Sequence, residues 1–92
     1  MPDGDPWNVE FAPRAVRQRR ALSPRDQGRV SEAIEQLALG AENVDLRKLH
    51  GRADDWAIRV GNFRVLFRFR RRERTVYVLE VLHRHEAYRE RS

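Results

Sequence analysis

The sequence contains no cysteine and no long hydrophobic run. The absence of cysteine excludes disulfide bridges, thiolate zinc sites and a cysteine nucleophile. No apolar stretch approaches the roughly 20 residues that a membrane helix requires, and the first residues show no signal-peptide pattern. We therefore expect a cytoplasmic protein that has no membrane partner.

Lysine is almost as scarce as cysteine. Lys48 is the single lysine among 19 basic residues, so arginine supplies nearly all the positive charge behind the net charge of +5. The guanidinium group is planar, weakly hydrated and able to bind phosphate through two parallel hydrogen bonds. A GC-rich genome also replaces lysine by arginine throughout. The composition therefore suggests a polyanionic partner such as nucleic acid without establishing one.

The chain is short, with 92 residues, which suffices for one small domain and a single core. A ligand must then bind at the surface. Pro2, Gly4 and Pro6, together with two aspartates, predict a disordered leader over residues 1–6. We expect residues 7–92 to form one domain, because no internal repeat or domain boundary is evident.

The first half of the chain predicts a strand and two helices. Trp7–Phe11 alternates apolar and polar residues and predicts a strand with its apolar side chains toward the core. Pro13–Leu22 predicts a short, arginine-rich helix. A second helix is expected from Ser23 as N-cap and Pro24 in the first position to Gly40 as the stop. Its apolar stripe consists of Val30, Ala33, Ile34, Leu37 and Ala38.

A hairpin centred on Gly61-Asn62 is the most informative local pattern. Glycine supplies the positive φ of a tight turn between two apolar-rich runs, and the register then places Arg59 opposite Arg64. One face is expected to carry Trp56, Ile58, Val60, Phe63, Val65, Phe67 and Phe69, and the other Arg59, Arg64, Arg68 and Arg70 around Ala57 and Leu66. Like charges directly opposite each other weaken a sheet by roughly 0.2–1 kcal/mol. A bound anion such as phosphate explains why they are there.

The remaining segments complete an α+β fold. We interpret residues 44–51 as a connector and Thr75–Leu82 as the last strand of a three-stranded antiparallel meander that follows the N-terminal strand and two-helix hairpin. An odd-numbered loop before that strand predicts Tyr77, Leu79 and Val81 on the phenylalanine face. The same loop predicts Val76, Val78, Glu80, Leu82 and Arg84 on the arginine face. Residues 83–92 are expected to form a short C-terminal tail or helix.

Three segments carry a family resemblance. Val44–Gly51 is similar to a "kL.G" segment, Trp56–Phe67 to "yriRvGdyRvlY" and Leu82–Tyr88 to "v.hR..vY". With the leading strand and helical hairpin, this ordered set resembles the RelE/ParE superfamily of bacterial type II toxin-antitoxin toxins along nearly the whole chain.

The resemblance implies a RelE-like toxin held inactive by a cognate antitoxin in a hetero-oligomer. RelE-branch toxins cut messenger RNA in the ribosomal A site, whereas ParE-branch toxins inhibit DNA gyrase. Arg59 matches a basic position of the family, and Arg64 matches the arginine that follows the turn. Arg84 and Tyr88 match the C-terminal arginine and tyrosine. Ala57 stands where the best-known RelE branch has a lysine, which weakens the ribonuclease interpretation.

The chemistry would need neither metal nor cofactor if the RNA 2′-hydroxyl attacked the adjacent phosphate. Arg59 and Arg64 would then clamp the non-bridging oxygens, and Arg84 would neutralise charge on the leaving side. Tyr88 would orient the hydroxyl or stack on a base.

The remaining candidates have weaker support. His83 and His85 flank Arg84 and are candidates for the general base, although the sequence favours a surface polar residue for either one taken singly. His50 is expected to be a loop residue, and the histidine spacing predicts no metal site. Further candidates for RNA binding are Arg17, Arg20, Arg68 and Arg70, with a solvated surface as the alternative.

Three functions remain open from the sequence. The first is a ribosome-dependent mRNA endonuclease, or mRNA interferase, and the second is a ParE-like toxin that inhibits gyrase by binding. The third is a homologue that only binds an antitoxin.

Overall fold

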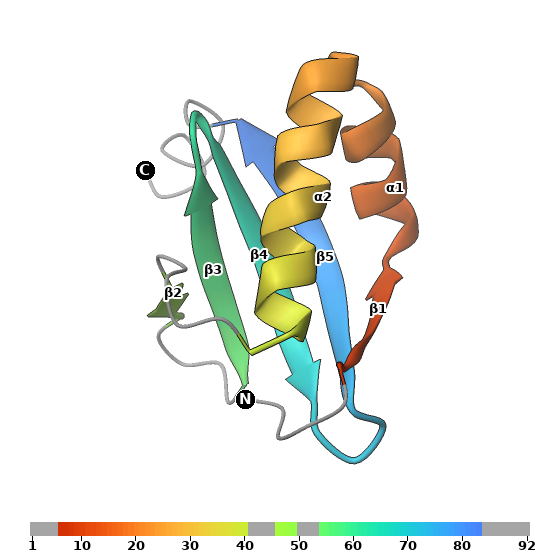
Figure 1. Ribbon diagram of the computed structural model, residues 1–92, viewed down its shortest axis with the longest axis vertical. Helices are drawn as coiled ribbons and strands as arrows, with labels where there is room; N and C mark the ends of the chain where they lie inside the picture. Colours follow the sequence, from red (N-terminus) through yellow and green to blue (C-terminus); the bar gives the residue numbers. More distant parts are fainter. Residues whose placement is uncertain (1–5, 41–45, 50–53, 84–92) are drawn as a thin grey trace.

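The computed structural model describes residues 6–40, 46–49 and 54–83. Its elements are β1 (Asn8–Phe11), α1 (Pro13–Arg20), α2 (Pro24–Ala38), β2 (Leu46–Lys48), β3 (Asp55–Val60), β4 (Phe63–Arg70) and β5 (Thr75–His83). The strands form one mixed sheet in the order β1-β5-β4-β3-β2, with β1 parallel to β5 and the other pairs antiparallel. Both helices lie on one side of this sheet (Figure 1). The expected α+β fold is confirmed.

The second helix begins as its sequence predicts. The Ser23 hydroxyl accepts a hydrogen bond from the Asp26 backbone N–H at 3.2 Å, and Pro24 occupies the first turn, where its missing N–H leaves no donor unsatisfied. Val30, Ile34 and Leu37 are buried against the sheet. The helix is therefore fixed by its cap at one end and by its apolar stripe along its length.

The first helix completes the edge of β5. β1 pairs only with the first part of β5, and the Ala12 N–H then donates to the Val78 carbonyl at 2.8 Å as the chain leaves the sheet. Farther along, the Gln18 side-chain oxygen accepts a hydrogen bond from the Val81 N–H at 2.6 Å. The Gln18 side chain thus accepts a hydrogen bond from a backbone N–H on a part of β5 that β1 does not reach. The same bond holds α1 beside the last part of β5.

The expected register of the central hairpin is confirmed. Arg59 lies opposite Arg64 and Ile58 opposite Val65. Gly61 has a φ of 57°, and a Cβ at this position would lie 2.8 Å from Nη2 of Arg29. Glycine is favoured by the left-handed backbone, whereas the Arg29 guanidinium lies at the end of a flexible side chain that could move aside.

In the first half of β5, the observed register shows that the sequence prediction was wrong. The loop before it has four residues, since Arg70 pairs with Thr75, and so Val76 and Val78 face the core while Tyr77 lies opposite Arg68. A bulge at Leu79 then shifts the pairing by one residue. Beyond the bulge Val81 faces the core and Glu80 and Leu82 lie on the arginine face, as predicted. Two valines are better accommodated in the core than a tyrosine hydroxyl, because a buried hydroxyl needs a hydrogen-bond partner.

One strand was missed in the sequence. Leu46–Lys48, interpreted as part of a connector, pairs antiparallel with β3 and extends the sheet to five strands. Three residues are too few for an alternating pattern to be recognised. Neither of the described helices is long and apolar enough to cross a membrane.

Candidate active site on the arginine face

The sheet face opposite the helices carries most of the candidate residues, and we call it the arginine face. Side chains that pair across strands project to the same side, so the register defines its members. They are Asn8, Glu10, Arg47, Asp55, Ala57, Arg59, Arg64, Leu66, Arg68, Arg70, Thr75, Tyr77, Glu80 and Leu82.

Arg59 and Arg64, the facing pair, lie near the turn of the β3–β4 hairpin, at the upper end of the sheet in Figure 1. Arg59 is exposed and Arg64 half-buried. Arg64 makes no hydrogen bond or ion pair with any residue that the structure describes. The register thus places two arginines at directly opposite positions of one face, and guanidinium groups bind phosphate through parallel hydrogen bonds.

Arg68 has a partner that the sequence analysis did not predict. Its Nε donates to Oδ1 of Asp55 at 2.6 Å and its Nη2 to Oδ2 at 3.1 Å. The Asp55 carboxylate is buried, with 2% of the residue exposed. Hydrogen bonding to Asp55 raises the pKa of Arg68 above its usual value. The charge of Arg68 is therefore compensated, and this arginine joins the beginning of β3 to β4.

A second clamp lies beside the first. Arg71 donates to both carboxylate oxygens of Asp54, at 2.8 and 2.9 Å, and this contact raises the pKa of Arg71. The pair is more exposed than that of Arg68 and Asp55. Together the two clamps fix the end of the sheet that lies away from the facing pair.

Arg70 stacks on an aromatic ring. The guanidinium carbon lies over the Tyr77 ring at 4.0 Å from its centroid. A guanidinium that lies flat on a ring keeps its in-plane N–H donors available. Arg70 is exposed, so its predicted role in RNA binding is compatible with this contact and stays a prediction.

Glu80 pairs with an arginine of α1. Its Oε1 accepts from Nη1 of Arg14 at 3.2 Å, and the side chains of Arg14 and Glu80 are 65% and 21% exposed. The sequence analysis placed Glu80 on the arginine face, and the register confirms this position. The ion pair with Arg14 joins one oxygen of the Glu80 carboxylate to the helix that borders β5.

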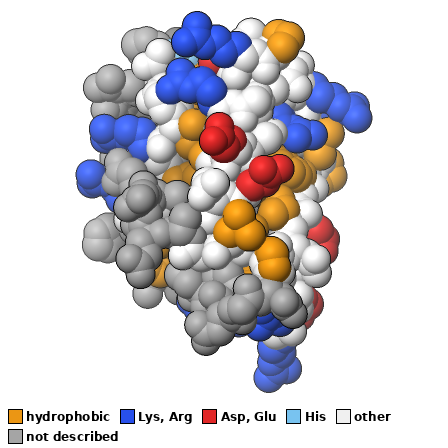
Figure 2. Space-filling model, viewed as in Figure 1, with side chains coloured by type: hydrophobic (Ala, Val, Ile, Leu, Met, Phe, Trp, Pro, Cys, Tyr) orange, Lys and Arg blue, Asp and Glu red, His pale blue; other side chains and the backbone are white. Residues whose placement is uncertain are grey.

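The other arginines of α1 divide into two groups. Arg19 lies over the Phe11 ring at 4.7 Å, and its Nη1 donates to the Ser31 hydroxyl at 3.4 Å, so it packs the helix against its neighbours. Arg17 and Arg20 are exposed, and their role in RNA binding stays a prediction. Figure 2 shows that basic side chains also lie around the margin of the helix-bearing side. Positive charge alone therefore does not locate the site.

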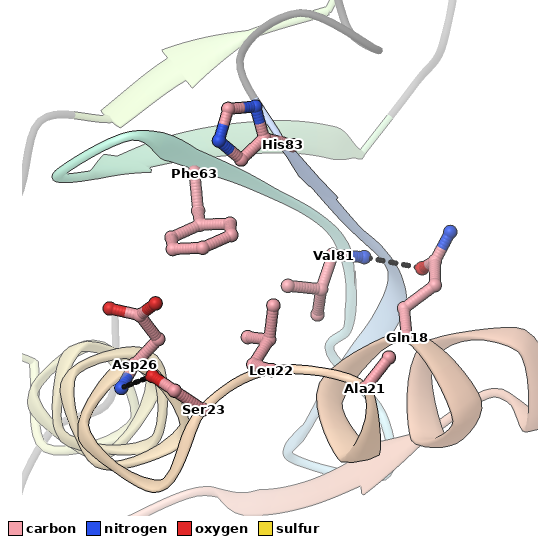
Figure 3. A pocket seen from close by; sticks show the side chains of 8 residues that line it. All are labelled: Gln18, Ala21, Leu22, Ser23, Asp26, Phe63, Val81 and His83. Carbon is pink, nitrogen blue, oxygen red and sulfur yellow. Dashed lines mark hydrogen bonds between the residues drawn. The ribbon is translucent and has the colours of Figure 1, made fainter.

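His83 lies on the opposite face of the sheet from the facing pair. It pairs with Phe63 across the strands, and the two rings meet edge to face at 5.4 Å. Its side chain lines a pocket of about 400 Å³ between the helices and the sheet, where Phe63, Leu22 and Val81 point inward (Figure 3). The remaining lining residues are Gln18, Ala21, Ser23 and Asp26. Because the sheet lies between this imidazole and the facing pair, the geometry gives no support to His83 as their base.

Three other candidates, Arg84, His85 and Tyr88, lie outside the described residues, as does His50. Ala57 is described and lies on the arginine face opposite Leu66, so the position where the best-known RelE branch has a lysine offers no amine there. In the described part of the chain, no group of three His, Asp or Glu side chains is arranged to hold a metal ion.

Asp55, Arg14 and Tyr77 are the polar partners that the sequence analysis missed. The pairing of Asp55 with Arg68 could have been predicted from the sequence, because it follows when the hairpin register is extended by one step beyond Trp56 and Phe67. The contact between Arg14 and Glu80 joins residues 66 positions apart and has no local signal. Tyr77 was assigned to the wrong face because the bulge was not anticipated.

Comparison with known proteins connects this geometry to a family. The family model for the ParE toxin of the type II toxin-antitoxin system parDE matches residues 9–88. The toxin-antitoxin complex RelBE2 from Mycobacterium tuberculosis contains a chain with 31% identity and a TM-score of 0.73, covering 87% of this chain and 100% of that one.

Two further structures have the same fold. In the RelB-RelE complex from Methanococcus jannaschii, identity is 25%, the TM-score is 0.74, and 89% of this chain and 98% of that one are covered. The isolated RelE toxin of E. coli has 21% identity and a TM-score of 0.73, with 92% and 94% of the two chains covered, and shows the likeness of fold alone. No curated protein sequence matches.

Proposed function

Since the chain belongs to the RelE/ParE superfamily of type II toxin-antitoxin toxins, we propose that it is a ribosome-dependent mRNA endonuclease and that the arginine face is its active surface. The observation that carries this proposal is the facing pair. Arg59 and Arg64 lie directly opposite each other on the face away from the two described helices, and Arg64 has no counter-ion among the described residues. A phosphate diester would supply a counter-ion to Arg64.

The proposed reaction uses the RNA as its own nucleophile. The 2′-oxygen attacks the adjacent phosphorus, the bond from phosphorus to the 5′-oxygen breaks, and the products are a 2′,3′-cyclic phosphate and a 5′-hydroxyl end. Negative charge grows on the non-bridging oxygens in the transition state, and Arg59 and Arg64 stabilise it there by hydrogen bonds. The family resemblance adds Arg84 on the leaving side and Tyr88 at the hydroxyl or base.

The proposed regulator is an antitoxin. The relative from M. tuberculosis was crystallised in a toxin-antitoxin complex. We propose that this chain forms a similar hetero-oligomer in the cytoplasm, in which an acidic or amphipathic segment covers Arg59 and Arg64. Apolar anchors would supply most of the affinity, and the charges would contribute mainly to specificity and association rate.

A second candidate function is inhibition of DNA gyrase by binding. The match to the ParE family model over residues 9–88 favours it, as does the absence of an amine at Ala57. In this function the arginine face would recognise a protein surface and perform no chemistry.

The two functions are separated by their products. Translating ribosomes are incubated with the purified toxin and the RNA ends are mapped, while gyrase supercoiling is measured in parallel. Endonuclease activity predicts new 5′-hydroxyl ends, and a single 2′-deoxy nucleotide at the cleavage position should stop cleavage while leaving binding almost unchanged. Inhibited supercoiling without new RNA ends would replace the first proposal by the second.

A further inference from the structure

Among the described residues, Glu80 is the carboxylate nearest in register to the facing pair. On β5, Glu80 lies opposite Leu66 and Leu82 lies opposite Arg64. Glu80 and Arg64 are thus diagonal neighbours on the arginine face. Diagonal neighbours in an antiparallel pair have Cα atoms about 7–8 Å apart, which long side chains can span.

The carboxylate is held in place from the other side. Arg14 contacts only Oε1 of Glu80, at 3.2 Å, and Oε2 has no hydrogen bond to any described residue. The helix that carries Arg14 is itself fixed to β5 by the bond between Gln18 and the Val81 N–H. One oxygen is therefore anchored and the other is left to accept a proton.

Other titratable side chains of the described part are placed less well for this task. Asp55 is buried and doubly bonded to Arg68. Glu10 lies opposite Tyr77 on β1, on the far side of the bulge. His83 is on the opposite face of the sheet.

We propose that Glu80 is the general base of the cleavage reaction, an inference that rests on the proposed endonuclease function. Its carboxylate accepts the proton of the 2′-hydroxyl as the 2′-oxygen bonds to phosphorus. The leaving 5′-oxygen takes a proton from water, and Glu80 returns its own proton to water. No oxidant, reductant or other reactant is consumed. Arg14 keeps the carboxylate oriented.

The test compares two variants that break the same ion pair. Glu80→Gln removes the base and Arg14→Gln removes only its anchor, and both keep a side chain of similar size. Cleavage is measured on programmed ribosomes with toxin in excess, so that the rate of the chemical step is observed. A general base contributes roughly 10²–10⁴-fold, so Glu80→Gln should lose at least about 100-fold. Arg14→Gln should lose less than about fivefold, because the carboxylate remains.

The cleavage rates of the two variants distinguish a catalytic role of Glu80 from a structural one. Equal losses in the two variants would reduce Glu80 to a structural partner of Arg14, and an unchanged rate in Glu80→Gln would also overturn the assignment. Circular dichroism and ribosome binding establish that each variant is folded, and Glu80→Ala provides a second substitution if Gln destabilises the sheet. If the unmodified toxin produces no 5′-hydroxyl ends, the endonuclease function fails first and the base assignment fails with it.

Discussion

The two ends of the arginine face use the same residue type for different purposes. At the lower end, Arg68 is bound by both oxygens of Asp55, and Arg70 lies on the Tyr77 ring. At the upper end, Arg59 faces Arg64, another cation. The comparison teaches that the groups around an arginine, and not the arginine itself, indicate whether its guanidinium supports the fold or, as for Arg64, has no partner among the described residues.

The first prediction addresses the upper end and has the largest expected effect. Arg64→Ala should lower the cleavage rate at least about 100-fold, because an oriented donor to the transition state is lost. Its fold should persist, since the side chain points away from the core. The measurements are RNA end mapping and circular dichroism, with Arg72→Ala, an exposed loop arginine, as the matched control. A folded variant with full activity would remove the facing pair from the mechanism.

The second prediction addresses the lower end. Arg68→Ala should lower the free energy of unfolding by about 2 kcal/mol, because it leaves the buried Asp55 carboxylate without its main partner. Half of the Arg68 side chain is exposed, which keeps the loss below that of a fully buried pair. Urea denaturation measures the change. The folded fraction should cleave RNA at nearly the normal rate, and a selective loss of activity would show that Arg68 also contacts the substrate.

The third prediction sharpens the distinction between charge and geometry. Arg64→Lys should retain the fold and the charge but lose about tenfold in rate, since an ammonium cannot make two parallel hydrogen bonds to a phosphate. Single-turnover cleavage measures it beside Arg64→Ala. Full activity in the lysine variant would mean that the site needs only a positive charge.

The smallest effect is expected for the outer clamp. Arg71→Ala should change the free energy of unfolding by less than about 0.5–1 kcal/mol, because both partners are substantially exposed and an exposed ion pair is worth little. The same denaturation experiment compares it with Arg68→Ala. A loss as large as that of Arg68→Ala would show that the two clamps act as one unit.

The sequence predicted the part of the structure that is encoded locally. Gly61-Asn62 determined the turn, and the strict alternation of two strands then determined that Arg59 meets Arg64. Ser23 and Pro24 marked the beginning of α2 because capping depends on neighbouring residues. These features involve residues a few positions apart, where the physical rule needs no knowledge of the rest of the fold.

The features that could not be predicted depend on distant parts of the chain. The pairing of Glu80 with Arg14 requires α1 to lie along β5. The three-residue strand β2 is stabilised as a strand only by its pairing with β3. The face of Tyr77 depends on a loop length and on a bulge that compensate each other, and neither has a composition that distinguishes it.

The bulge at Leu79 also affects the curvature of β5. If Leu79 is counted out, β5 alternates without interruption, with Val76, Val78 and Val81 inward. The surplus residue therefore shifts the alternation by one position: Val76 and Val78 face the core before it, and Val81 faces the core after it. It also bends and twists the strand, so that the part carrying Glu80 follows a different direction from the part joined to β1. The direction in which the arginine face is presented around Glu80 thus depends on the backbone at one position, independently of every charged side chain.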